Sequence, residues 1–145
     1  MYLIDTSLYI HAERDPMFRD ALRTFLSRAA AKVLVSSVVI HELLVGVTTR
    51  AAREAVVRDV VRPFSERRRI VETDTLVWRE AALIVERLAA AGGYADRLKT
   101  ASFRHDVLIA ASCRRVGATL ITANRKDFDL IASMRGFRFA TALPE

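Results

Sequence analysis

The sequence predicts an α/β fold in which helices cover both faces of a parallel sheet. Short β-branched or apolar runs alternate with longer segments whose apolar residues recur at spacings of three and four, the pattern of amphipathic helices. Glycines stand where two of these helices should end, at Gly92-Gly93 and at Gly117. Alternation of strands and helices along the chain favours parallel strand pairing.

Five short runs are predicted to be buried strands, and four longer segments are predicted to be helices. The strands are YLI at 2–4, VLV at 33–35, IV at 70–71, TLI at 119–121 and RFA at 138–140. The helices cover 17–30, 38–61, 75–91 and 105–116. The segment 92–103 between the last two helices is polar and is predicted to be a loop.

Length and composition favour one domain over residues 1–145, because a chain of this size can bury a real hydrophobic core. The apolar fraction of 52% argues against disorder. A single cysteine, Cys113, forms no internal disulfide and is expected in the core. No apolar run has transmembrane length. We therefore expect a soluble, cytoplasmic protein that does not associate with membranes.

The chain is basic, with 23 Lys and Arg against 17 Asp and Glu and a net charge of +6. A basic balance favours a polyanionic partner such as nucleic acid. Basic residues are spread along the chain without a dominant block, so charge alone leaves this interpretation and an ordinary solvated surface equally open.

Acidic residues stand at positions where parallel sheets place their sites, beyond the carboxyl ends of strands. Asp5 directly follows the first predicted strand, and Asp106 begins the helical pattern HDVLIAASC. Each has a structural alternative. Asp5 could cap a helix, and Asp106 could be an acid of the first helical turn, favoured by the helix dipole.

Glu42 is harder to explain as a structural residue, because it lies in the apolar segment SSVVIHELLVG at 36–46. Its neighbours at helical spacing include Val38, Val39 and Val45. A carboxylate on such a face needs an arginine, a hydrogen-bond network, a raised pKa or a metal ion.

Together these residues predict a metal site. Asp5, Asn124 and Asp127 follow predicted strands, and Glu42 lies near the start of the helix after the second strand, at the same sheet edge. Several converging carboxylates would repel one another without a cation, and a hard divalent ion with oxygen ligands is the simplest counterion. An acidic site in a basic protein indicates a metal centre that receives a polyanion.

The motifs around these residues resemble those of PIN-domain ribonucleases, and especially the VapC-type toxins of bacterial toxin–antitoxin pairs. The resemblance rests on LIDTS at 3–7, SSVVIHEL at 36–43, HDVLIAAS at 105–112 and TANRKDF at 122–128. It covers essentially the whole chain, and the order and spacing of the motifs make it specific. It implies a PIN-like α/β/α sandwich around a parallel sheet of about five strands.

The resemblance implies a metal-dependent endoribonuclease, with Asp5, Glu42 and Asp106 as ligands of Mg²⁺ or Mn²⁺. The family's fourth acidic position commonly falls two residues after the threonine, where this chain has Asn124. Asp127 either supplies the missing charge or has a structural role. Asn124 and Asp127 therefore stay alternative catalytic residues for this position. Thr6 and Thr122 are expected to orient carboxylates or water.

Substrate and partners follow from the same resemblance. The substrate would be RNA, with Arg104, Arg125 and Lys126 as candidate contacts to its backbone because they lie near the motif loops. The protein partner would be a small antitoxin, and homodimerisation is common in the family. The helix around Trp78 could serve a dimer, although a core role is the favoured interpretation for its apolar face.

Other enzyme classes lack their motifs. HELLV at 41–45 misses the second histidine of the H-E-x-x-H zinc motif, and no phosphate-binding glycine loop or G-x-S-x-G is present. An aspartyl-phosphate enzyme would need a further acid near Asp5, where Ser7 stands. One alternative remains open. Asn124 is also compatible with a non-catalytic RNA- or protein-binding module of the same fold.

Overall fold

Five parallel strands form the central sheet, in the order β3-β2-β1-β4-β5. The computed structural model describes residues 1–145. The strands are β1 (Tyr2–Ile4), β2 (Val33–Ser36), β3 (Ile70–Val71), β4 (Thr119–Ile121) and β5 (Arg138–Ala140). The predicted fold class and all five predicted strands are thereby confirmed.

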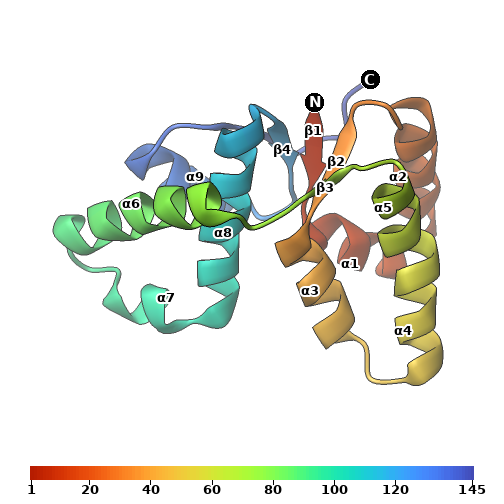
Figure 1. The fold of residues 1–145 in the computed structure, drawn as a ribbon, viewed down its shortest axis with the longest axis horizontal. Coiled ribbons are helices and arrows are strands. Elements are labelled where there is room, and N and C mark those ends of the chain that lie inside the picture. The colour runs from red at the N-terminus through yellow and green to blue at the C-terminus, as the bar shows by residue number, and fades with distance from the viewer.

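Helices cover both faces of this sheet, as predicted from the alternation (Figure 1). Helices α6, α8 and α9 lie on one side, and α1, α2, α4 and α5 lie on the other. The helical elements are α1 (Thr6–Arg14), α2 (Pro16–Arg28), α3 (Ser37–Gly46), α4 (Arg50–Val56), the π-helix η1 (Val57–Val61), α5 (Arg62–Glu66), α6 (Thr75–Ala91), α7 (Ala95–Lys99), α8 (Ala101–Val116) and α9 (Arg125–Met134).

Alternating residues of the strands divide the core into two parts. Leu3 and Leu120 face the larger cluster, which α6, α8 and α9 cover. Ile4 and Ile121 face the smaller cluster beneath α1 and α2. Successive side chains of a strand point to opposite faces, so a sheet buried on both sides reads as a continuous apolar run. Cys113 is fully buried in the larger cluster, as expected.

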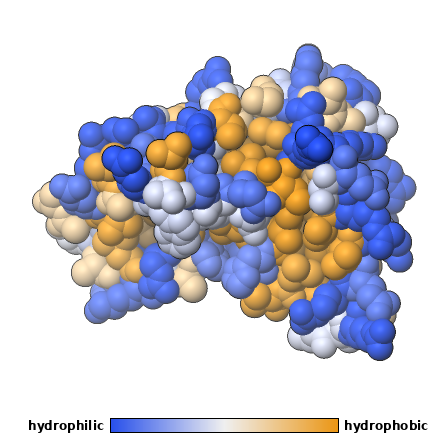
Figure 2. Space-filling view, in the orientation of Figure 1, coloured by the Kyte–Doolittle hydropathy of each residue, from blue (hydrophilic) through white to orange (hydrophobic).

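The prediction of one continuous helix over 38–61 is wrong, because α3 ends at Gly46 and α4 begins at Arg50. Val47 is extended, and the hydroxyl of Thr49 accepts a hydrogen bond of 3.1 Å from the backbone nitrogen of Ala52. This N-cap starts a new helix. Apolar residues gather on the surface over α3 (Figure 2), where Val45 is 68% exposed.

Two further predictions need correction. The segment 92–103 is not simply a loop, since it contains α7 and the first turn of α8. The helix α6 has its predicted bounds, with Val77 and Ile84 in the core, but Trp78 is 57% exposed and does not belong to the core. No helix of the protein combines the length and apolar character needed to span a bilayer.

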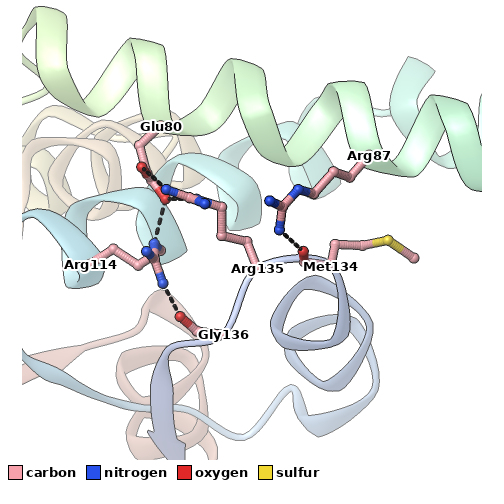
Figure 3. Close-up of polar contacts among 6 residues, drawn as sticks. All are labelled: Glu80, Arg87, Arg114, Met134, Arg135 and Gly136. Atoms are coloured by element: carbon pink, nitrogen blue, oxygen red, sulfur yellow. Dashed lines mark hydrogen bonds and ion pairs between the residues drawn. The ribbon is translucent and has the colours of Figure 1, made fainter.

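A polar cluster fastens α6 to α8 and to the segment between α9 and β5 (Figure 3). The Glu80 carboxylate on α6 accepts hydrogen bonds from the guanidinium groups of Arg114 on α8 and Arg135 after α9. Arg114 also donates to the carbonyl of Gly136. The hydrogen bond from Arg135, assisted by Arg114, lowers the pKa of the Glu80 carboxyl. Three distant segments are thereby joined on the side of the sheet that carries the larger core.

Candidate active site

The predicted site residues gather at the carboxyl ends of β1, β2 and β4. Asp5 follows β1 directly, Glu42 lies in the middle of the helix after β2, and Asn124 stands between β4 and α9. Helix α8 runs past the same edge and brings Asp106 from its second turn (Figure 1). The parallel order of the strands places these segments together, although they are far apart in the sequence.

Asp5 occupies the N-cap position of α1, but its side chain makes no capping hydrogen bond. Its Oδ2 atom instead accepts hydrogen bonds from the hydroxyls of Ser7, at 2.5 Å, and Thr122, at 2.6 Å. The side chain is almost completely buried, with 3% of the residue exposed. The capping alternative for Asp5 is therefore not supported, and the hydroxyl of Thr122 instead donates a hydrogen bond to its carboxylate.

Glu42 has two polar partners, which explains how the apolar segment tolerates it. Its Oε2 atom accepts a hydrogen bond from the hydroxyl of Thr6, and its Oε1 atom lies 3.1 Å from Nδ1 of His105. The ring of His105 in turn packs edge-on against His41, with 5.4 Å between the ring centroids. Thr6 thus holds Glu42 in the way that Thr122 holds Asp5.

Asp106 lies on the buried face of α8, with 9% of the residue exposed. Because α8 begins at Ala101, the interpretation of Asp106 as a first-turn acid is wrong. Its Oδ2 atom accepts a hydrogen bond of 3.2 Å from Nδ2 of Asn124. Burial, together with the charges of Asp5, Asp127 and Glu42, raises the pKa of the Asp106 carboxyl to about 8.

Asn124 joins Asp106 to Asp127 and also begins a helix. Its side-chain oxygen accepts from the backbone nitrogen of Asp127 at 3.4 Å, as an N-cap of α9. Its Nδ2 atom donates to Asp127 Oδ2 at 2.9 Å as well as to Asp106. The other oxygen of Asp127 is paired with Arg97 of α7. Both candidates for the fourth position therefore lie beside Asp106.

The three predicted RNA contacts are all exposed, but two of them have protein partners. Arg104 donates to the backbone carbonyls of Leu98 and Lys99, at 3.1 and 2.9 Å, and so holds the end of α7. Arg125 pairs with Asp129 one turn along α9, at 3.2 Å. Lys126 is exposed beside the N-terminus of the same helix. These groups stay candidates for the contact with a polyanion.

Comparison with known proteins identifies the family. A scan against protein families matches residues 2–133 to the family described as PIN domain. The chain belongs to the PIN domain family. No curated protein matches it in sequence.

Solved structures resemble this PIN domain over nearly its whole length. DNA-bound VapBC from Salmonella typhimurium aligns with a TM-score of 0.69 and 21% identity, covering 96% of both chains. FitAcB from Neisseria gonorrhoeae aligns with a TM-score of 0.70 and 20% identity, covering 96% of both chains. VapBC2 from Rickettsia felis, bound to a promoter DNA fragment, aligns with a TM-score of 0.63 and 19% identity over 96% of both. Likeness at this level of identity shows the shared fold.

The donors at this edge of the PIN domain fit a hard divalent cation in chemistry and in charge. Asp5, Glu42 and Asp106 supply carboxylate oxygens, and the pKa of Asp106 is raised first by burial and then by the charges of the neighbouring acids. No three His, Cys, Asp or Glu side chains lie together as a ready-made metal site, and hydroxyl and amide groups donate hydrogen bonds to the carboxylates of Asp5, Glu42 and Asp106. Metal binding therefore requires these side chains to turn toward one another.

The sequence reasoning missed the roles of three residues at this site. Ser7 donates to Asp5, His105 contacts Glu42, and Arg97 pairs with Asp127. For Ser7 the motif LIDTS contains a signal, because a hydroxyl two residues after a strand-end acid can reach back to it. For Arg97 the sequence carries no signal, because its partner lies 30 residues away.

Proposed function

We propose that this PIN domain is a metal-dependent endoribonuclease in which Asp5, Glu42 and Asp106 hold Mg²⁺ or Mn²⁺. The observation that supports the proposal most strongly is the state of Asp106. It is a buried carboxyl whose pKa is raised to about 8 by burial and by three neighbouring acids. A divalent cation would relieve the part of this rise that comes from the neighbouring negative charges.

The residues of this chain would have four roles in this reaction. Asp5, Glu42 and Asp106 would supply the ligands, and Thr122 and Thr6 fix the orientation of the first two. Arg125 and Lys126, exposed at the start of α9, would contact the RNA backbone. Asn124 and Asp127 lie beside Asp106 and are the two alternative residues for the fourth position.

The proposed reaction is hydrolysis of an RNA phosphodiester. When bound, the divalent cation supplies Lewis acidity and lowers the pKa of a coordinated water. Water adds to phosphorus, the P–O3′ bond breaks, and the departing O3′ takes up a proton. The products carry 5′-phosphate and 3′-hydroxyl ends, as in the family that the sequence resembles.

An assay on purified protein tests this proposal. Transfer RNA, ribosomal RNA and messenger RNA are incubated with Mg²⁺, with Mn²⁺ or with a chelator, using wild-type protein and Asp106→Asn. We expect cleavage that requires the metal and is lost in the variant. Binding of RNA in chelator without cleavage under any condition would favour the alternative, a non-catalytic binding module.

We further propose that the protein is the toxin of a toxin–antitoxin pair. The sequence motifs resemble VapC-type toxins, and the structural neighbours are VapBC and FitAB assemblies. Co-purification with the product of an adjacent reading frame, and loss of RNA cleavage in that complex, would support the proposal. Full cleavage activity in the complex would count against it.

A homodimer is proposed on separate grounds. One face of helix α6 exposes large apolar side chains that a lone subunit leaves in water, namely Trp78 at 57% and, two turns further on, Val85 at 36%. Light scattering on the purified chain measures its mass. Substitution of Trp78 by Glu should yield monomers if this face is the interface, and an unchanged mass would exclude Trp78 from it.

A further inference from the structure

Arg97 places a permanent positive charge among the acidic residues of the site, at the carboxyl ends of the strands. The residue belongs to the short helix α7, and its guanidinium pairs with Oδ1 of Asp127. The guanidinium carbon also lies 5.3 Å from the centroid of the Phe103 ring, a cation–π contact that helps to fix its position. The Arg97 and Asp127 side chains are only 32% and 25% exposed, so water screens this pair incompletely.

The pair lies next to Asp106, on the other side of the Asn124 amide. Nδ2 of Asn124 is 3.2 Å from Oδ2 of Asp106 and 2.9 Å from Oδ2 of Asp127. A two-metal site holds its ions about 3.5–4 Å apart. An ion shared by Asp106 and Asp127 would therefore have to displace the Asn124 amide and approach the guanidinium of Arg97.

We propose that Arg97 is a positioning residue that neutralises Asp127 and restricts the site to one divalent cation. This inference rests on the proposed function, which assigns a divalent ion to Asp5, Glu42 and Asp106. A guanidinium keeps its charge at every accessible pH and matches a carboxylate in shape. It leaves Asp127 without the free negative charge that a second hard ion needs, and it repels such an ion directly.

The stoichiometry of Mn²⁺ binding to the full chain, without RNA, tests this inference. Electron paramagnetic resonance measures free Mn²⁺ during a titration of wild type, Arg97→Gln and Lys99→Gln. The control removes the same charge from the same helix, but the Lys99 side chain is 76% exposed and pairs with Asp96. We expect one ion per chain for wild type and for Lys99→Gln, and two for Arg97→Gln.

Further variants separate the charge from the fold. Arg97→Lys keeps the charge and should retain one ion. Arg97→Gln combined with Asp127→Asn removes both members of the pair and should also return the count to one. Arg97→Met keeps apolar contact with Phe103, and it replaces Arg97→Gln if circular dichroism shows that the latter is unfolded.

The outcomes distinguish this inference from the proposed function. Two ions in wild type would overturn the role of Arg97. One ion both in wild type and in Arg97→Gln, or in Arg97→Met where it replaces that variant, would also overturn it. If metal-dependent cleavage persisted in wild type, that result would leave the nuclease proposal standing. No Mn²⁺ binding to wild type would overturn both.

Discussion

Nδ2 of Asn124 lies 3.2 Å from Oδ2 of Asp106, so the amide that follows β4 donates to the most strongly perturbed carboxyl of the site. This contact predicts the effect of Asn124→Asp. A carboxylate would remove the donor and add a negative charge, so the metal-free protein should melt at a lower temperature. Mn²⁺ should bind more tightly and should recover the loss. Calorimetric titration and thermal melts measure both effects, and weaker binding of Mn²⁺ would place residue 124 outside the coordination sphere.

Thr122→Val tests the orientation of Asp5. The substitution keeps the shape of the side chain but removes the hydroxyl that donates to Asp5 at 2.6 Å. Loss of an outer hydrogen bond to a ligand typically weakens metal affinity about 10- to 100-fold. We expect a loss of that size in Mn²⁺ affinity, and Asp5→Asn, which removes the ligand itself, should cost more. Equal affinity of Thr122→Val and wild type would show that Asp5 is not a ligand held by Thr122.

The stability of the metal-free protein should depend on Asp106 and pH. The pKa of Asp106 is raised from 3.8 to about 8, so between these values the folded state binds more protons than the unfolded state. The free energy of unfolding therefore decreases as pH rises through this window. When the pH is raised from 5.5 to 8, the melting temperature of wild type should fall by more than that of Asp106→Asn. Added Mg²⁺ should reverse the loss at pH 8. Parallel pH profiles of the two proteins would contradict the assignment.

Glu80→Gln tests the polar cluster that joins α6, α8 and the end of α9. Hydrogen bonds to charged groups contribute roughly 1.5–3 kcal/mol each, and Glu80 accepts from two guanidinium groups. We expect a loss of about 1–3 kcal/mol in the free energy of unfolding at neutral pH. Because Arg135 and Arg114 lower the pKa of Glu80, the difference from wild type should shrink as pH falls below 4.5. Glu86→Gln, at an exposed position of the same helix, is the matched control.

The strands could be predicted from the sequence because each is a short apolar run with both faces buried. All five lie at their predicted positions, and only β2 extends one residue further, to Ser36. Helices α1, α5, α7 and α9 lie outside the four predicted helices. Their starts depend on local geometry, such as the Asn124 side chain accepting from Asp127. Local propensity alone does not reveal such contacts.

Three acidic residues of the site were predictable from their places in the sequence, because Asp5 and Asp127 follow predicted strands and Glu42 interrupts an apolar helix. The partners were harder to predict. His105 reaches Glu42 across 63 residues and Arg97 reaches Asp127 across 30, and each contact depends on how helices pack. The raised pKa of Asp106 likewise results from burial and from charges that only the folded chain brings together.

Anomalous X-ray scattering from a crystal grown with Mn²⁺ tests the metal site most directly. The account predicts an anomalous peak within coordination distance of oxygens of Asp5, Glu42 and Asp106, and no such peak in Asp106→Asn. The opposite result would contradict the account: Asp5, Glu42 and Asp106 would keep their contacts to Thr122, Thr6 and Asn124, and no anomalous peak would appear among them at saturating Mn²⁺.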